Sequence, residues 1–256
     1  MTTAHDPVRV LAIDTATEAV VTGVVTVLGD QVTTLAERSI TENRRHAEIL
    51  TTLIREVLDE AGIAGSDLDA VVVGVGPGPF TGLRVGMATA SAYADALGLP
   101  VHGVCSLDGI AVDAALDGET LVVTDARRRE VYWARYRGAE RIDGPGVLAP
   151  AALETGDATL VGPRRFLDSI DHAGSRELFA PTAAGLVTAL STHKFAQGAE
   201  SDSFAQGAEG DSPCSLSELA SRKAAGPLEP LYLRRPDAVE LKDQRRKSLL
   251  PVTGGE

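Results

Sequence analysis

The sequence predicts an α/β protein made of two similar halves, the second reduced. Three observations indicate this fold class. Residues 8–104 alternate between strand-like apolar runs and helix-like segments in the order βββαβαβ. A glycine- and proline-rich turn at residues 76–79 joins a buried strand to a helix. A strand that ends at an aspartate and is followed by a second strand occurs twice, at Asp14 and at Asp125.

The first half opens with three strand-like runs, at residues 8–13, 20–27 and 31–40. The second run is rich in β-branched side chains, and Gly29-Asp30 joins it to the third as a short hairpin. Residues 43–61 then place apolar side chains at three- and four-residue spacing. This pattern predicts an amphipathic helix that Gly62 ends.

The central unit of the chain is a strand at 71–75, the turn Gly76-Pro-Gly-Pro, a helix from Gly82 or Leu83 to Leu97, and a strand at 101–104. Thr81 is the predicted N-cap and Gly98 the predicted stop. The turn fits neither a Walker A loop nor a dinucleotide fingerprint, because the required glycines and lysine are missing. It is either a tight turn for close helix packing or an anion or partner site made of backbone amides.

Small residues recur every fourth position along the predicted 82–97 helix, at Gly82, Gly86, Ala90 and Ala94. Glycine costs a helix about 1 kcal/mol relative to alanine, so Gly86 needs a packing reason. The stripe packs either on the protein's own sheet or on a helix of a second subunit. The sequence leaves both interpretations open.

The second half is predicted to contain helices at 106–116, 183–190 and 215–225, and strands at 120–124, 130–137 and 159–161, with an extended segment at 227–235. Two adjacent nine-residue copies, at 195–203 and 204–212, are rich in small and acidic residues. We interpret them as a flexible surface insertion at 194–212. The predicted organisation is therefore a first half at 1–104, a second at 105–235 and a charged tail at 236–256.

Composition excludes several classes of protein. The 256 residues carry a net charge of −12, which argues against a free-standing tRNA-binding protein. No apolar run is long enough to span a membrane, and the N-terminal residues lack the features of a signal peptide. With only two cysteines there is no disulfide framework. We expect a cytoplasmic protein with no membrane partner.

Few side chains are placed for chemistry. Two aspartates, Asp14 and Asp125, stand at the ends of predicted strands. Together with Thr15, which follows Asp14, they are candidates for nucleotide binding, although an aspartate at such a position more often caps a turn. No two of the five histidines are four residues apart, so no helix offers a histidine pair to a metal ion. Nothing near Ser106 or Cys105 in the sequence supplies a general base. We therefore predict no catalytic residue and no metal site.

Five stretches together resemble the bacterial TsaB (YeaZ) family. They are LAIDTATEAVVTGVV at 11–25, RRHAEIL at 44–50, VGVGPGPFTGLRVG at 73–86, TDARRREVYWARY at 124–136 and PLYLRRP at 230–236. The resemblance implies two ribonuclease-H-like halves of the actin and Hsp70 (ASKHA) type, with no complete nucleotide cleft. Ala16 stands where actin-like ATPases have a glycine in the phosphate turn, which weakens the nucleotide role of Asp14.

Members of this family are subunits of the machinery that makes N6-threonylcarbamoyladenosine (t6A) at position 37 of tRNAs reading codons that begin with A. The resemblance implies a non-catalytic scaffold that forms a homodimer and binds the catalytic paralogue TsaD, which the ATPase TsaE joins. The TsaD-type histidine pair is absent, since Val104 to Gly109 contains no histidine.

The same resemblance implies that partners bind the two helices of the first half. The interface residues would be Arg45, His46 and Ile49, with the stripe Gly82, Gly86, Ala90 and Ala94. It implies no cofactor in the isolated chain, with ATP or ADP only at the level of the complex, and contact with tRNA only through the complex. The alternative is an enzyme, either an actin-like phosphotransferase or a metalloprotease.

Overall fold

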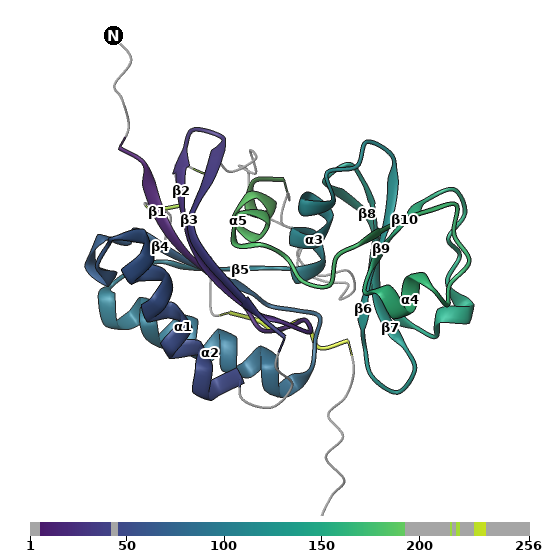
Figure 1. The fold of residues 1–256 in the computed structure, drawn as a ribbon, viewed down its shortest axis with the longest axis horizontal. Helices are drawn as coiled ribbons and strands as arrows, with labels where there is room; N and C mark the ends of the chain where they lie inside the picture. Colours follow the sequence, from purple (N-terminus) through teal and green to yellow (C-terminus); the bar gives the residue numbers. More distant parts are fainter. Residues whose placement is uncertain (1–5, 42–45, 193–215, 217–218, 221–227, 234–256) are drawn as a thin grey trace, which may run out of the picture.

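The computed structural model describes residues 6–41, 46–192, 216, 219–220 and 228–233. Its first sheet contains β1 (Val8–Asp14), β2 (Val20–Leu28), β3 (Gln31–Ile40), β4 (Ala70–Gly74) and β5 (Val101–Val104). Their order is β3-β2-β1-β4-β5 (Figure 1). β2 is antiparallel to both β1 and β3, whereas β4 runs parallel to β1 and to β5. The predicted element order of residues 8–104 is confirmed.

The second sheet contains β6 (Glu119–Asp125), β7 (Val131–Arg137), β8 (Glu140–Leu148), β9 (Thr159–Gly162) and β10 (Gly174–Glu177). Their order is β10-β9-β6-β7-β8. β7 is antiparallel to β6 and β8, and β9 runs parallel to β6 and β10. With β6 in the place of β1, this sheet repeats the order and directions of the first. Asp14 and Asp125 therefore end equivalent strands.

The helices are α1 (His46–Ala61), α2 (Phe80–Leu97), α3 (Ser106–Ala114), α4 (Arg164–Leu167) and α5 (Ala183–Thr192), with short 3-10 turns at Gly65–Asp67 and Pro150–Ala152. α1 and α2 cover one face of the first sheet, and α3 and α5 lie between the two sheets (Figure 1). None of the described helices is long and apolar enough to cross a membrane.

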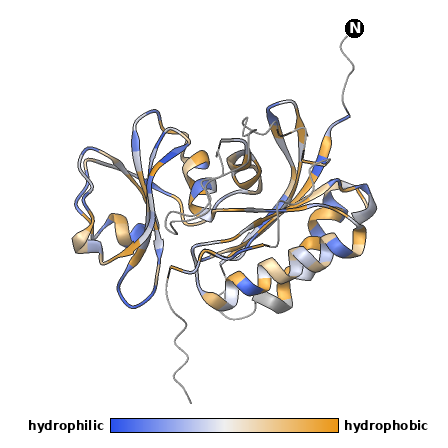
Figure 2. Cartoon of the chain, turned by 180° about the vertical axis from the view of Figure 1, so that it is seen from behind, coloured by the Kyte–Doolittle hydropathy of each residue, from blue (hydrophilic) through white to orange (hydrophobic). Residues whose placement is uncertain are grey.

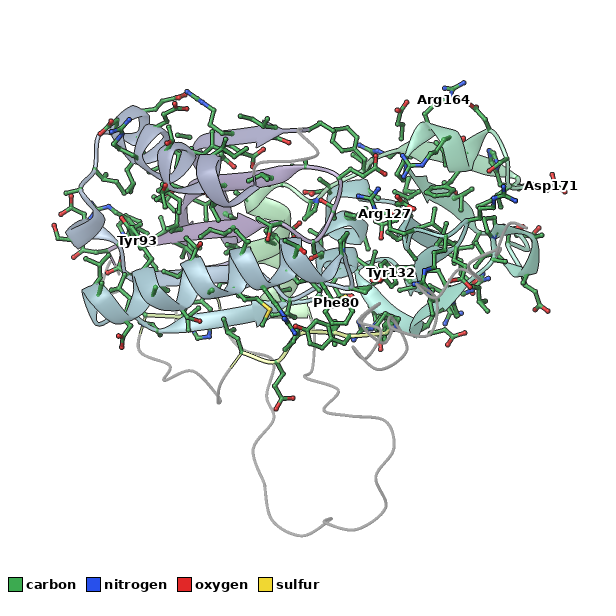
Figure 3. All side chains as sticks on the ribbon, turned by 90° about the horizontal axis from the view of Figure 1, so that it is seen from below. Phe80, Tyr93, Arg127, Tyr132, Arg164 and Asp171 are labelled. Carbon is green, nitrogen blue, oxygen red and sulfur yellow. The ribbon has the colours of Figure 1, made fainter. Side chains whose placement is uncertain are left out.

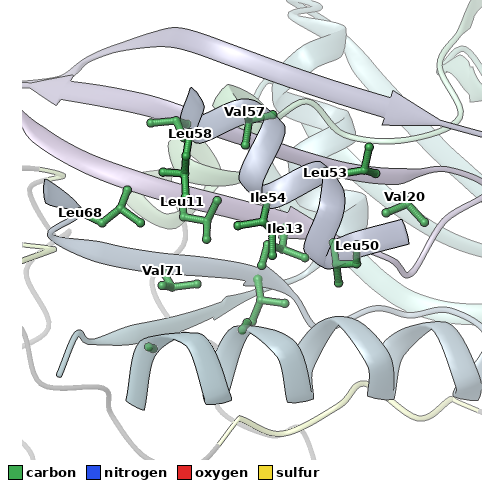
Figure 4. Close-up of a cluster of buried hydrophobic side chains, with 14 of the residues drawn as sticks. Leu11, Ile13, Val20, Leu50, Leu53, Ile54, Val57, Leu58, Leu68 and Val71 are labelled. Atoms are coloured by element: carbon green, nitrogen blue, oxygen red, sulfur yellow. The ribbon is translucent and has the colours of Figure 1, made fainter. Parts of the chain in front are cut away.

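Helices cover both faces of the central strands of the first sheet. Leu50, Ile54 and Val57 of α1 pack on Leu11 and other residues of the strands (Figure 4). On the opposite face, α5 packs on apolar residues of β1, β2 and β4. Because both faces are covered, every residue of β4 is buried, as expected for a central strand of a parallel region.

Residues 228–233 return from the end of the chain to the first half. The backbone N–H of Leu231 donates to the carbonyl oxygen of Val75, just after β4, at 2.8 Å. Tyr232 stacks on Phe80 at a centroid separation of 4.4 Å and accepts a hydrogen bond from Arg84 Nε at 3.1 Å. Figure 3 shows Phe80 at the end of α2 where this segment passes.

Several predicted boundaries need correction. α2 begins at Phe80 with Pro79 as its N-cap, so the prediction of Thr81 as N-cap was wrong, whereas Gly98 does end the helix, at φ +68°. α3 ends at Ala114, two residues before the predicted end. β8, α4 and β10 were not predicted. The duplicated segment at 195–212 and the tail at 236–256 lie outside the described residues, as does most of the predicted helix at 215–225.

Candidate functional site

Asp14 ends β1 and is completely buried. Its Oδ2 accepts a hydrogen bond from Ser106 Oγ at 2.5 Å. Its Oδ1 accepts hydrogen bonds from the backbone N–H of Ala16 at 3.1 Å and from Thr17 Oγ1 at 3.3 Å. Both carboxyl oxygens are thus bound by groups of the chain itself.

The same burial changes the acidity of Asp14. It raises the pKa of the carboxyl from its ordinary 3.8 to about 6, and the hydrogen bond from Ser106 is the largest opposing influence. A carboxyl with such a pKa is suited to general acid or base chemistry near neutral pH. Because Asp14 has no exposed surface, however, a substrate cannot reach it in this structure.

The glycine-rich turn and α2 pack directly against the residues that follow Asp14. A Cβ atom at Gly74 would overlap Asp14 Oδ2, and one at Gly78 would overlap the carbonyl oxygen of Ala16. The turn therefore has the tight-packing role that was one of its two predicted roles. Because the turn lies so close to Asp14 and Ala16, it covers the residues at the carboxyl end of β1.

The small-residue stripe of α2 faces this protein's own first half. Gly82, Gly86, Ala90 and Ala94 are all buried. A Cβ atom at Gly82 would overlap the carbonyl oxygen of Thr15, and one at Gly86 would overlap Thr15 Oγ1. The assignment of these four residues to a partner interface was therefore wrong, since all four are buried against the chain's own first half, where Ala90 and Ala94 belong to its hydrophobic core.

The predicted nucleotide-binding residues lie in different environments. Thr15 is 1% exposed and its hydroxyl donates to the carbonyl oxygen of Gly82 at 2.7 Å. Both residues are buried and hydrogen-bonded to other groups of the chain, so the structure does not support the prediction for either residue. Asp125 is partly exposed, and its role in nucleotide binding stays a prediction.

An ion-pair cluster joins the two halves beside these strand ends. Arg165 of α4 donates two hydrogen bonds to the carboxylate of Glu18, from Nη1 at 2.8 Å and from Nη2 at 2.5 Å. Its Nη2 also lies 3.4 Å from Asp125 Oδ2. Arg165 therefore connects the turn after β1 to the end of β6.

The described part of the chain offers little to metal or thiol chemistry. It contains no group of three or more His, Cys, Asp or Glu side chains that could hold a metal ion. Burial raises the pKa of the Cys105 thiol, and the carboxylate of Asp108 raises it further. Because the thiolate is the reactive form, Cys105 is a poor nucleophile.

The outward face of α2 is exposed and carries mostly small side chains. Arg84, Ala88, Ala92 and Ala96 recur every fourth residue on the side opposite the buried stripe. Hydrophobic and hydrophilic residues both occur along α1 and α2 (Figure 2). Of the other predicted interface residues, Ile49 is partly buried on the core of the first half. Arg45 and the side chain of His46 lie outside the described residues.

Sequence reasoning missed the contacts of Ser106, Glu18 and Arg165. Ser106 follows β5, and the carboxyl ends of parallel strands meet at one edge of a sheet, so its position near Asp14 had a signal in the predicted strand order. Arg165 had none, because α4 is a four-residue helix with no readable periodicity.

The fold is that of a duplicated α/β protein, because its two sheets share one strand order and an aspartate ends the first strand of each, β1 and β6. At the first of these aspartates, Asp14, the chain's own residues leave no open binding site. Comparison with known proteins narrows this class. The profile of the family described as TsaD, tRNA N6-adenosine threonylcarbamoyltransferase, matches residues 33–155. The tRNA threonylcarbamoyladenosine biosynthesis protein TsaB of Escherichia coli is 37% identical over 135 residues, 52% of this chain and 56% of that protein.

Longer matches come from other bacteria. The uncharacterised proteins ML0378 of Mycobacterium leprae and Rv3421c of Mycobacterium tuberculosis are 48% and 46% identical, over 90% and 91% of this chain. The matches cover 55% of the M. leprae protein and 94% of the M. tuberculosis protein. The structure of YeaZ from Pseudomonas aeruginosa, 28% identical, aligns with a TM-score of 0.60 over 71% of this chain and 90% of that one. The chain belongs to the TsaB (YeaZ) family.

Proposed function

We propose that this chain is a non-catalytic subunit of the machinery that makes t6A at position 37 of tRNAs reading codons that begin with A. The names of its E. coli relative and of the matching TsaD family support this role. The observation that carries the non-catalytic part is the closed end of β1, where Ser106, Ala16 and Thr17 bind both oxygens of Asp14.

The two halves are proposed to be ribonuclease-H-like halves of the actin type, the second reduced. Their identical strand order and directions support this assignment. In actin-like ATPases the nucleotide sits between such halves. Here the turn after β1 is packed under α2, so we propose that ATP or ADP acts only at the level of the complex.

The proposed docking surface is the outward face of α2, which we call the α2 outer face: Arg84, Ala88, Ala92 and Ala96. Its alanines let a partner helix approach closely, and α1 lies beside it, with Ile49, on the same side of the first sheet. The partner is the catalytic paralogue TsaD, and a second copy of this chain competes for the same face. TsaE joins the pair, and tRNA is bound only through the complex.

An enzyme of its own, either an actin-like phosphotransferase or a metalloprotease, is the less favoured alternative. A phosphotransferase needs access to the aspartate after β1, and Asp14 has none. A metalloprotease needs a ligand cluster, and the described residues contain none.

The proposal is tested by co-purifying the chain with the transferase encoded in the same genome. We expect a complex by size exclusion with light scattering, and t6A formation that needs both proteins. Ala88→Leu with Ala92→Leu should leave the fold unchanged by circular dichroism and should weaken the complex at least tenfold, because two bulky side chains hold a partner helix away.

Ala152→Leu is the matched control, since Ala152 is an exposed alanine of the second half. It should assemble as the unmodified chain does. Equal assembly of the α2 variant and the control would refute the α2 outer face as the docking surface. Steady ATP hydrolysis or peptide cleavage by the isolated chain would refute the non-catalytic role.

A further inference from the structure

Three consecutive arginines form the turn between β6 and β7. Arg127, Arg128 and Arg129 have φ angles of +62°, +54° and +64°. This left-handed region disfavours residues with a Cβ atom, and glycine or asparagine is the usual occupant. Strained backbone of this kind persists where the surrounding structure holds it, often at functional sites. The arginine side chains therefore need a reason for their presence.

The hairpin holds the turn firmly. The N–H of Ala126 donates to the carbonyl oxygen of Glu130 at 3.0 Å. The N–H of Glu130 donates to the carbonyl oxygen of Arg127, also at 3.0 Å. The N–H of Arg127 donates to Asp125 Oδ1 at 2.9 Å. All three arginines are exposed. The turn thus presents three guanidinium groups from one fixed base.

The charges around the turn favour an anion. Arg127 Nε lies 3.7 Å from Asp125 Oδ2, yet its side chain remains 65% exposed. Asp125 also contacts Arg165, which pairs with Glu18. Even with Glu130 included, cations outnumber anions here, in a chain whose net charge is −12. Figure 3 shows Arg127 near the junction of the two halves.

We propose that the turn Arg127–Arg129 binds phosphate groups of the backbone of a structured RNA, an inference that rests on the proposed function in tRNA modification. Guanidinium groups bind phosphate oxygens through two parallel hydrogen bonds. Three such groups lie within one short turn, where they can contact the phosphates of one strand. The fixed turn reduces the ordering cost of binding.

The test compares the unmodified chain with two variants of the turn. The triple variant Arg127→Asn, Arg128→Asn, Arg129→Asn removes the charge and keeps residues that tolerate the left-handed backbone. The triple variant with lysine at the three positions keeps the charge. Each is titrated with a fluorescently labelled tRNA transcript at several salt concentrations, both alone and co-purified with the transferase. Thermal melting verifies the fold.

Neutralising three phosphates contributes about 2 to 3 to the slope of log K against log salt concentration. In the asparagine variant the slope should be smaller by about 2, and the affinity at the lowest salt concentration should fall at least tenfold. The lysine variant should keep the slope of the unmodified chain. The asparagine variant should melt at the same or a higher temperature, because it relieves the backbone strain.

Equal slopes and affinities for the unmodified chain and the asparagine variant would overturn the proposal, as would undetectable binding of the transcript in both preparations. If the asparagine variant no longer co-purifies with the transferase but binds RNA as before, the turn binds an acidic protein surface instead, and the proposal is also overturned. Failure of the unmodified chain to assemble with the transferase refutes the proposed function itself, on which the role of the turn rests.

Discussion

Asp14 shows how one carboxyl can be predicted in position and not in environment. Its place at the end of a strand follows from the apolar run before it. Its burial does not, because Ser106 reaches it from 92 residues away and Gly74 leaves the space for its Oδ2. The carboxyl is a structural link between the ends of β1 and β5, and its unusual acidity has a measurable consequence.

We expect Asp14 to make the stability of the chain depend on pH. Its pKa is about 6 in the folded chain against an ordinary 3.8, so the folded state binds the proton more tightly. The stabilisation from the protonated carboxyl is fully present below pH 3.8 and is lost as the pH rises through about 6. At 1.36 kcal/mol per pKa unit, the shift corresponds to ~3 kcal/mol.

Urea unfolding between pH 4 and pH 7 measures this effect. Asp14→Asn should unfold with a free energy that falls less steeply with pH than that of the unmodified chain. Ser106→Ala removes the donor that lowers the pKa most, so it should move the fall to higher pH. If Asp14→Asn keeps the full pH dependence, another group is responsible.

At the scale of the element, α2 has two small-residue faces with different roles. The stripe with Gly82 and Gly86 allows the helix to approach Thr15, and the α2 outer face lies on the other side. Spacing alone did not separate the two, because small residues suit close approach to a sheet and to a partner helix equally. Only the direction of the helix on the sheet decides between them.

Gly86→Ala tests the buried face by the sign of its effect. In an unconstrained helix this change stabilises by about 1 kcal/mol. Here the new Cβ atom overlaps Thr15 Oγ1, so we expect a loss of about 1–3 kcal/mol in the free energy of unfolding. In a Thr15→Ala background the loss should shrink, because the overlapping hydroxyl is gone. A stabilising Gly86→Ala would contradict the packing described for α2.

The elements that sequence reasoning found are those with a strong local signal. β1, β2 and α1 have apolar runs or helical spacing, and their observed bounds lie close to the predicted ones. β8 was missed because Gly144-Pro145-Gly146 interrupts it and because it is an edge strand whose few apolar residues do not alternate. β10 is a short, exposed edge strand, and α4 spans four residues. Their positions depend on pairing and packing rather than on pattern.

At the scale of the whole molecule, α3 and α5 connect the two sheets by packing between them. α5 follows the second sheet in the sequence but packs on the first. α3 packs on the second sheet and on α5. Asp113 of α3 accepts hydrogen bonds from the N–H and hydroxyl of Thr182, just before α5, at 2.6 and 2.7 Å. Glu37 of β3 accepts one from the N–H of Ala183 at 2.6 Å.

This arrangement predicts that the two halves unfold together. Leu186 of α5 is completely buried and contacts the first sheet and the α3 residue Gly109, so Leu186→Ala should cost about 2–5 kcal/mol. At 2–4 °C per kcal/mol for a chain of this size, the melting temperature should fall by roughly 4–20 °C. Trp133, the single tryptophan, lies in β7 and reports on the second half. The unfolding transition seen by its fluorescence should shift in temperature by as much as the transition seen by circular dichroism of the whole chain. Leu97→Ala is the control: this residue is 38% exposed, so its replacement should shift both transitions little.

A Trp133 transition that stays at the original temperature while the circular dichroism transition shifts would show that the second half unfolds independently and that α5 does not couple the halves.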